Sequence, residues 1–335
     1  MEFGATFAPL VGPSVGAARS FRDWMATAEQ VCATLDRVGF HFVVLTHSYQ
    51  YGGLQPLVTM ARLAPVTGSL RMATQVLLLP LLNAADVAYN VATLDHVCEG
   101  RLDLGIGLAY HHRELELAGV SRRERVAKFE ESLEVMRQFW RGEAVHHDGR
   151  YYRIHGAQMG LTPYQQPHPP IWVAAHSHGA ATRAGRLGDG LVVGPQIDHQ
   201  SAGSLVETFG QEWDRHHREA PTRVGAWRGV LIGSNAQEAL ERGEQSGLLT
   251  FRRYLEGGME EPSTAGLRLT LGDDAAEWAI LGNYADCREG LRRCRDEMGL
   301  THVTCQFYNL PEDLSARLEY LEGFGEEVIQ KLAAG

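Results

Sequence analysis

A glycine pair, Gly105 and Gly107, ends an alternating apolar run and directly precedes a charged, helix-like stretch. Glycine after a strand lets the backbone approach a phosphate or a ring closely, which suggests a nucleotide-binding turn. The dinucleotide fingerprint needs a further glycine or alanine three residues after the second glycine, where this chain has Tyr110. The pair by itself therefore indicates either a cofactor contact or a tight exit from a strand.

A single histidine, His47, follows the strand-like segment FVVLT. A histidine near its ordinary pKa can donate or accept a proton at neutral pH, so this position suits acid–base chemistry or the stabilisation of a developing anion. The alternative is a loop histidine bonded to a neighbouring carbonyl.

A polar turn, His176 to Gly179, lies between the apolar segment IWVAA and a helical pattern that begins near Gly179 or Ala180. The first turn of a helix exposes backbone N–H groups with partial positive charge, and Ser177 adds a hydroxyl, so the turn predicts a phosphate site. Ser177 is equally expected to cap the helix, and the two roles are compatible.

Histidine pairs and the cysteines do not form a metal or nucleophile motif. His111–His112, His146–His147 and His176–His178 lack a third ligand at a recognisable spacing, and HExxH and GxSxG motifs are absent from the sequence. Five cysteines without CxxC spacing predict buried, reduced thiols. We therefore expect no metal site.

The composition indicates a globular protein that acts on a small molecule. Apolar residues make up 44% of the 335-residue chain, and the formal net charge is −10. This charge disfavours nucleic acid or an anionic membrane as a partner, so an anionic ligand needs a local site. The sequence contains no apolar run long enough for a membrane span and no signal-like start, so we expect a cytoplasmic protein.

Strand-like and helix-like segments alternate along the chain, and this rhythm predicts the fold. Eight strand-like segments precede helical patterns, which favours a (β/α)8 barrel over a doubly wound sheet. The expected strands are 2–8, 40–45, 70–79, 102–108, 171–175, 190–193, 227–232 and 302–307. The active site of such a barrel lies at the carboxyl ends of its strands.

Two segments interrupt the alternation within the single barrel domain expected over residues 1–335. The stretch HHDGRYYRI after the fourth helix has a hairpin-like DG turn, and a proline-rich connector follows it. Residues 257–282 are polar and glycine-bearing, which is typical of a mobile loop. We expect an inserted hairpin at the first position and a late loop over the substrate site at the second.

These segments together resemble the bacterial luciferase-like flavin-dependent oxidoreductases, a family of (β/α)8 barrels. The strongest stretch is RMATQVLLLPLLNAADVAYNVATLDHVCEGRLDLGIGLAY, and PPIWVAAHSHGAATRAGRLGDG is also similar. The resemblance covers nearly the whole chain. It implies that the glycine pair lies at a strand end beneath a flavin, where a bulkier residue would intrude on the cofactor.

The resemblance also implies roles for individual residues. His47 corresponds to a second-strand histidine of the luciferase catalytic subunit, although Thr46 and Ser48 depart from that subunit's pattern and argue against a light reaction. Tyr110 resembles the tyrosine that reaches the flavin phosphate in sulfonate and alkane monooxygenases. The implied cofactor contacts are Thr74 and Gln75, often beside a non-proline cis peptide, then Leu108, Ala109, Tyr110, His176, Ser177, His178 and Gly179.

The family implies two main activities. A monooxygenase binds reduced FMN supplied by a separate reductase and uses oxygen on a small organic substrate, whereas an F420-dependent oxidoreductase exchanges a hydride with its substrate. The match at Tyr110 favours FMN, and a non-catalytic flavin-binding relative is a further alternative. Tyr49, Tyr51 and Gln196 are candidate substrate contacts, with apolar core contacts as the alternative for each. We expect a homodimer formed through early helices including 84–98.

Overall fold

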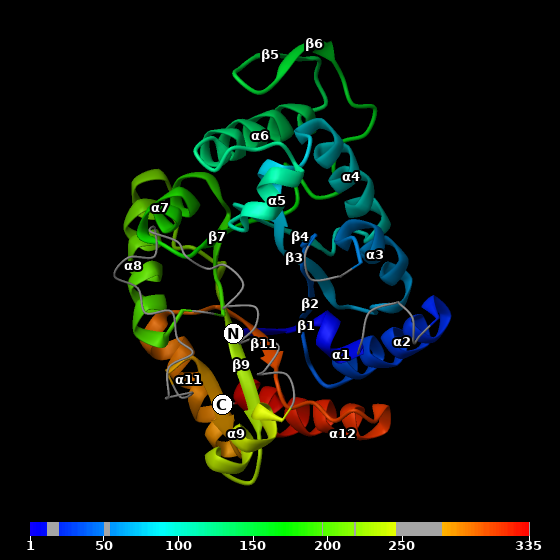
Figure 1. The fold of residues 1–335 in the computed structure, drawn as a ribbon, viewed down its shortest axis with the longest axis vertical. Coiled ribbons are helices and arrows are strands. Elements are labelled where there is room, and N and C mark those ends of the chain that lie inside the picture. The colour runs from blue at the N-terminus through cyan, green and yellow to red at the C-terminus, as the bar shows by residue number, and fades with distance from the viewer. Residues whose placement is uncertain (12–19, 50–53, 196, 218, 246–276, 335) are drawn as a thin grey trace. The chain divides into compact units, whose positions relative to one another are not determined.

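The structure is a computed structural model that describes residues 1–11, 20–49, 54–195, 197–217, 219–245 and 277–334. It contains two compact units. The first unit comprises residues 1–44, 66–71 and 172–335, and the second unit comprises residues 45–65 and 72–171. Figure 1 shows the chain coloured from its N-terminus to its C-terminus.

The fold is a (β/α)8 barrel, as the alternation predicted. The strand order is β11-β1-β2-β3-β4-β7-β8, and β9 pairs with both β8 and β11, so the order closes on itself. All pairings described along this order are parallel. The eight strands are β1 (Glu2–Thr6), β2 (Phe42–Leu45), β3 (Arg71–Leu78), β4 (Leu102–Gly107), β7 (Ile171–Ala175), β8 (Gly190–Val193), β9 (Val224–Ile232) and β11 (His302–Phe307).

Most of the longer helices follow a strand and begin at a side-chain cap. Ser20 accepts a hydrogen bond from the backbone of Asp23 at the start of α2, and Asn83 caps α4 in the same way. Gly299 ends α11 with a φ of 65°, in the left-handed region that favours glycine. The longer helices are α2 (Phe21–Arg37), α3 (Pro56–Leu63), α4 (Ala84–Val97), α6 (Arg125–Trp140), α7 (His178–Leu187), α8 (His199–His216), α9 (Ala236–Glu244), α11 (Tyr284–Met298) and α12 (Leu314–Phe324).

Two elements differ from the sequence prediction. The first strand ends at Thr6 rather than residue 8, because Phe7–Val11 form the short helix α1. A further strand, β10 (Ala279–Gly282), pairs with β9 where we expected a loop. Residues 257–276 of the expected late loop lie outside the described part of the chain.

Aromatic side chains of the first unit pack together in the barrel interior near the start of its strands. The ring of Trp172 on β7 lies 4.8 Å from that of His302 on β11, although β8 and β9 separate these strands. The contact therefore crosses the barrel interior. Phe42 also contacts His302, and a Cβ atom at Gly4 would overlap the Phe42 ring, so only glycine leaves room for that ring.

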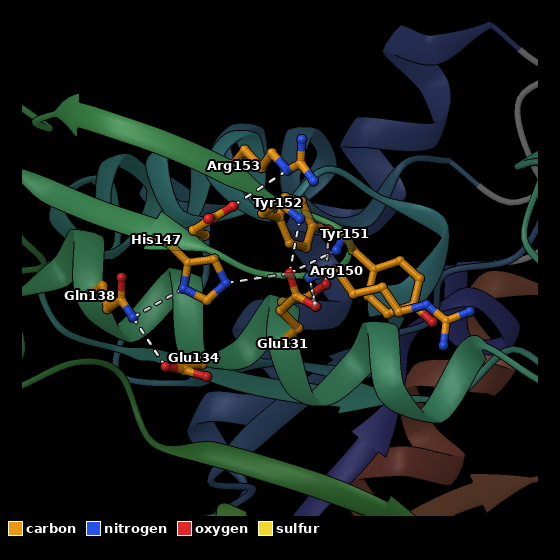
Figure 2. A network of polar contacts seen from close by, with 10 residues as sticks. Glu131, Glu134, Gln138, His147, Arg150, Tyr151, Tyr152 and Arg153 are labelled. Atoms are coloured by element: carbon orange, nitrogen blue, oxygen red, sulfur yellow. Dashed lines mark hydrogen bonds and ion pairs between the residues drawn. The ribbon is translucent and has the colours of Figure 1, made fainter.

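A small antiparallel hairpin of β5 (Val145–Asp148) and β6 (Arg153–Ala157) follows α6 in the second unit. Figure 2 shows how the carboxylate of Glu131 on α6 holds it: Oε1 accepts hydrogen bonds from the backbones of Tyr151 and Tyr152, each at 2.9 Å. His147 lies 3.3 Å from the same oxygen. Burial opposes ionisation of Glu131, yet these hydrogen bonds lower its pKa, so the carboxylate anchors the hairpin.

All five cysteines are buried and none forms a disulfide, in agreement with the expected free thiols. Among the described residues, no helix has the length and apolar character needed to cross a membrane.

Candidate active site

His47 is fixed by two backbone contacts with β3. Its own N–H donates to the carbonyl of Val76 at 3.3 Å, and the N–H of Leu78 donates to Nδ1 of its ring at 3.2 Å. A ring nitrogen that accepts a hydrogen bond carries no proton, so the neutral imidazole holds its proton on Nε2. No described residue bonds to Nε2.

The surroundings of His47 keep the ring neutral. The residue is 8% exposed, and burial lowers its pKa, an effect that the nearby charge of Glu114 partly opposes. Because the cationic form is disfavoured, the neutral ring with an Nε2–H donor is the main form at pH 7. Such a donor can stabilise negative charge that develops on a neighbouring atom.

Glu114 is the functional residue that our sequence reasoning missed. It lies on the short helix α5 (His112–Leu117) and is 2% exposed. Its Oε1 accepts hydrogen bonds from the hydroxyl of Ser48 and the N–H of Tyr49, both at 2.8 Å. The ring of Tyr49 in turn lies edge-on to His47 with 4.9 Å between ring centroids. Glu114 therefore holds the segment that carries His47.

Thr74 and Gln75, for which the resemblance implies cofactor contacts, lie on β3, and the peptide bond between Gln75 and Val76 is cis. The hydroxyl of Thr74 donates to the carbonyl of Gly105 at 2.8 Å and accepts from its N–H at 2.9 Å. Because both hydrogen bonds of this hydroxyl go to Gly105 on β4, a contact between Thr74 and a cofactor would come from the backbone of Thr74.

Gly105 is required by strand packing, a reason separate from the cofactor approach that the resemblance implies. A Cβ atom at this position would overlap the carbonyl oxygen of Thr74 on the neighbouring strand. The glycine is therefore required by the close approach of β4 to β3, whether or not a cofactor lies above it.

The segment after β4 combines a packed residue with polar ones. The side chain of Ala109 is fully buried in a cluster with Leu78 and Leu115, and its carbonyl accepts a hydrogen bond from Arg125 at 2.8 Å. Leu108 and Tyr110 are partly exposed, and the ring of Tyr110 lies 4.3 Å from that of His111. Burial lowers the pKa of His111, so this ring is also mainly neutral.

In the first unit, the turn before α7 caps the helix as the sequence indicated. The Ser177 hydroxyl oxygen accepts a hydrogen bond from the N–H of Ala180 at 3.3 Å. Nδ1 of His178 lies 2.7 Å from the hydroxyl of Thr208 on α8, which packs beside α7 (Figure 1). A Cβ atom at Gly179 would meet nothing within 4 Å, so the first turn is open on that side.

The structure thus brings part of the predicted site together. His47, Thr74, Gln75, Leu108, Ala109 and Tyr110 belong to the second unit, whereas His176, Ser177, His178 and Gly179 belong to the first. Tyr49 is 50% exposed, and Tyr51 and Gln196 lie outside the described residues. The described residues contain no group of three or more histidine, cysteine, aspartate or glutamate side chains that could hold a metal ion.

Residues 1–302 match the family of luciferase-like monooxygenases. The chain belongs to this family. Membership confirms the resemblance drawn from the strand and turn motifs, and it makes the chain one of a class of oxidoreductases.

The chain is similar to a curated reductase and to solved structures that are described with different cofactors. The chain is 34% identical over 168 residues to the phthiodiolone/phenolphthiodiolone dimycocerosates ketoreductase of Mycobacterium tuberculosis, a match that spans 48% of this chain and 43% of the relative. Its fold matches the oxygenating constituent of 3,6-diketocamphane monooxygenase from Pseudomonas putida, solved with FMN, with a TM-score of 0.80, 20% identity and coverage of 99% and 98%. It also matches the coenzyme F420 dependent tetrahydromethanopterin reductase of Methanopyrus kandleri, with a TM-score of 0.72, 16% identity and coverage of 99% of both chains.

Proposed function

We propose that this luciferase-like protein is a flavin-dependent monooxygenase that uses reduced FMN and oxygen on a small organic substrate. The observation that carries the proposal is the buried His47, whose Nδ1 accepts from Leu78 and whose Nε2–H is left for a ligand. Reactions of reduced flavin with oxygen develop negative charge on an oxygen atom. A fixed, neutral hydrogen-bond donor stabilises that negative charge. Unlike a positively charged donor, it neither repels a cation nor binds an anion tightly.

The residues before and along α7 fit the phosphate of FMN. The helix has no acidic residue in its first turn, and its charged side chains are the cations Arg183 and Arg186. The Ser177 oxygen uses a lone pair to cap the helix, so its hydroxyl proton can still be donated to a phosphate oxygen. Such a site provides local attraction for a dianion in a chain of net charge −10.

The protein's own contribution to the reaction would come mainly from the His47 segment. When bound, reduced FMN would supply the electrons that activate oxygen. His47 would donate a hydrogen bond from Nε2 to the oxygen atom that gains negative charge. Glu114 would keep Ser48 and Tyr49 in place, and the Tyr49 ring would limit the orientations open to His47.

An F420-dependent oxidoreductase is the alternative, because solved structures of this fold include F420-dependent enzymes. In that reaction His47 would act as acid or base during hydride transfer. Tyr110 favours FMN through its resemblance to the phosphate-binding tyrosine of the flavin monooxygenases. A flavin-binding protein without turnover would keep the phosphate site and lose the role of His47.

We also propose a homodimer, with a separate reductase that supplies reduced FMN. The outer face of α4 exposes Tyr89 and Val97, which are 57% and 45% exposed, and Val58 on the adjacent α3 is 70% exposed. Apolar side chains gathered on neighbouring helices are typical of an interface between copies. Light scattering that gives the monomer mass across micromolar concentrations would contradict the dimer.

Titration with three cofactors tests the proposed function. The purified protein is mixed separately with FMN, FMN reduced under anaerobic conditions, and F420, and binding is followed by absorbance. We expect reduced FMN to bind most tightly, with a micromolar or lower dissociation constant. Binding of F420 without FMN would establish the alternative, and binding of none of the three would contradict both enzymes.

A further inference from the structure

Two buried polar atoms without hydrogen-bond partners lie at the ends of neighbouring barrel strands. They are the hydroxyl oxygen of Thr6, at the end of β1, and the Oε1 atom of Gln306, near the end of β11. Thr6 is 4% exposed. Buried polar atoms are almost always paired, so an unpaired one needs an explanation, and an absent ligand is one.

The strand register places both side chains on the same face. β1 and β11 are parallel with Glu2 opposite His302 and Ala5 opposite Cys305, so one further step sets Thr6 opposite Gln306. The side chains of Glu2 and His302 meet at 3.2 Å, four residues earlier on each strand. Because side chains alternate with a period of two, Thr6 and Gln306 face the barrel interior as His302 does.

The two ends of this interior face differ in how they are filled. At the amino ends of the strands, Phe42, Trp172 and His302 pack together. At the carboxyl ends, where barrels of this type bind ligands, the Thr6 and Gln306 atoms have no partner. Packed aromatic rings thus fill the lower layer, where Trp172 Nε1 also lacks a partner, whereas the upper layer presents the unpaired Thr6 and Gln306 atoms.

The surroundings in the first unit are neutral and aromatic. Gly229 on β9 lies opposite Gln306, and the space next to it is occupied by the rings of Trp278 and Tyr308. Arg228 lies opposite Cys305 and therefore faces the other side of the sheet, where its Nη2 contacts Met298. No positive charge on this stretch of β9 faces the interior to bind a carboxylate, sulfonate or phosphate.

We propose that Thr6 and Gln306 form a binding site for an uncharged group that both donates and accepts hydrogen bonds. Gln306 Oε1 can only accept, whereas the Thr6 hydroxyl can donate and accept. A hydroxyl or carboxamide of the substrate satisfies both atoms, and so does the N–H and C=O edge of a flavin ring. A carboxylate has no proton to donate to Oε1 of Gln306. The proposal deepens the proposed function, since it rests on the barrel mouth as the ligand site.

The first test measures stability without any ligand. Thr6→Val keeps the shape of the side chain and removes an unpaired hydroxyl, so the melting temperature of the protein should stay the same or rise. Thr74→Val is the control, because that hydroxyl makes two buried hydrogen bonds with Gly105 and its loss should lower the melting temperature. A comparable fall for Thr6→Val would show that its hydroxyl is already satisfied and would overturn the proposal.

The second test measures binding of FMN, cyclohexanecarboxamide and cyclohexanecarboxylate to the parent, Thr6→Val and Gln306→Leu. We expect the parent to bind the amide more tightly than the carboxylate, or FMN to bind through its ring edge. Each variant should weaken the ligand that uses the site by about 5- to 20-fold. If the variants lose affinity for FMN alone, the group that occupies the site is the flavin edge. If they lose affinity for the amide alone, the group belongs to the substrate. Unchanged binding of both would overturn the proposal.

These outcomes separate the site from the proposed function. If FMN binds the parent and both variants equally while Thr6→Val lowers the melting temperature, this site is wrong and the flavin-dependent function stands. If FMN does not bind but the amide binds in a manner that depends on Thr6 and Gln306, the site stands and the proposed function is wrong.

Discussion

The backbone N–H of Leu78 on β3 donates a hydrogen bond to Nδ1 of His47, with 3.2 Å between the two nitrogens. This contact helps to join His47, two residues after the end of β2, to the neighbouring strand, and it selects the tautomer of the ring. It leaves Nε2–H as the only proton donor of the neutral side chain. The role of hydrogen-bond donor proposed for His47 follows from a backbone contact that the sequence does not reveal.

The pH dependence of stability should reflect the buried histidine. Burial lowers the pKa of His47 in the folded protein below its ordinary value of 6.5, so the unfolded chain binds more protons as the pH falls through that value. The free energy of unfolding should therefore decrease from pH 8 to pH 5.5. Urea unfolding of the flavin-free protein should show a smaller decrease for His47→Gln. Identical pH profiles would contradict a lowered pKa.

Glu114→Ala should destabilise the protein by about 2 kcal/mol, because the Ser48 hydroxyl and the Tyr49 N–H lose a buried charged acceptor. Glu114→Gln keeps an acceptor but removes the charge that raises the pKa of His47. NMR titration of the His47 ring should then give a lower pKa than in the parent. Glu116→Gln, on the exposed face of α5, is the control and should change neither quantity. An unchanged His47 pKa in Glu114→Gln would disprove the coupling.

Gly105→Ala should destabilise the protein by about 3 kcal/mol or prevent its folding, because the added methyl group overlaps the Thr74 carbonyl. Gly210→Ala, within α8, is the matched control. A Cβ atom there meets nothing within 4 Å, so alanine should stabilise the helix by about 0.5–1 kcal/mol. Chemical denaturation measures both changes. A Gly105→Ala protein as stable as the parent would mean that β3 and β4 are further apart than described.

Ser177→Asp should weaken FMN far more than riboflavin, since a carboxylate at the turn repels the phosphate that riboflavin lacks. Aspartate also caps helices well, so the stability of α7 should be retained. Ser177→Ala is the control: it loses the cap, costs about 1 kcal/mol of stability and adds no charge. Equal weakening of FMN and riboflavin would place the phosphate elsewhere.

The barrel strands could be predicted from the sequence because each is a short apolar segment followed by a helical pattern, and this holds from β1 to β11. The strand β10 could not, since it follows a polar, glycine-bearing segment and pairs with β9 outside the closed order of the barrel. The helix α1 was missed because its five residues continue the apolar character of β1.

The site was predicted in part for similar reasons. His47 and Ser177 stand directly after apolar segments, where a barrel exposes polar groups, so their position alone marked them. Glu114 has the appearance of a solvated residue in the run HRELEL, and its role depends on Ser48 and Tyr49, 66 and 65 residues away. The requirement for glycine at position 105 likewise depends on the backbone of a different strand.

The central claim, that His47 acts in the reaction rather than in flavin binding, is tested by single-turnover oxidation of bound reduced FMN. The flavin-saturated parent, His47→Gln and His47→Ala are mixed with oxygen in a stopped-flow instrument across pH 5.5 to 9. We predict rates about 10²- to 10⁴-fold lower in the variants with little change in FMN affinity. Variant rates within a factor of about two of the parent, at every pH, would contradict the claim and favour a flavin-binding protein without turnover.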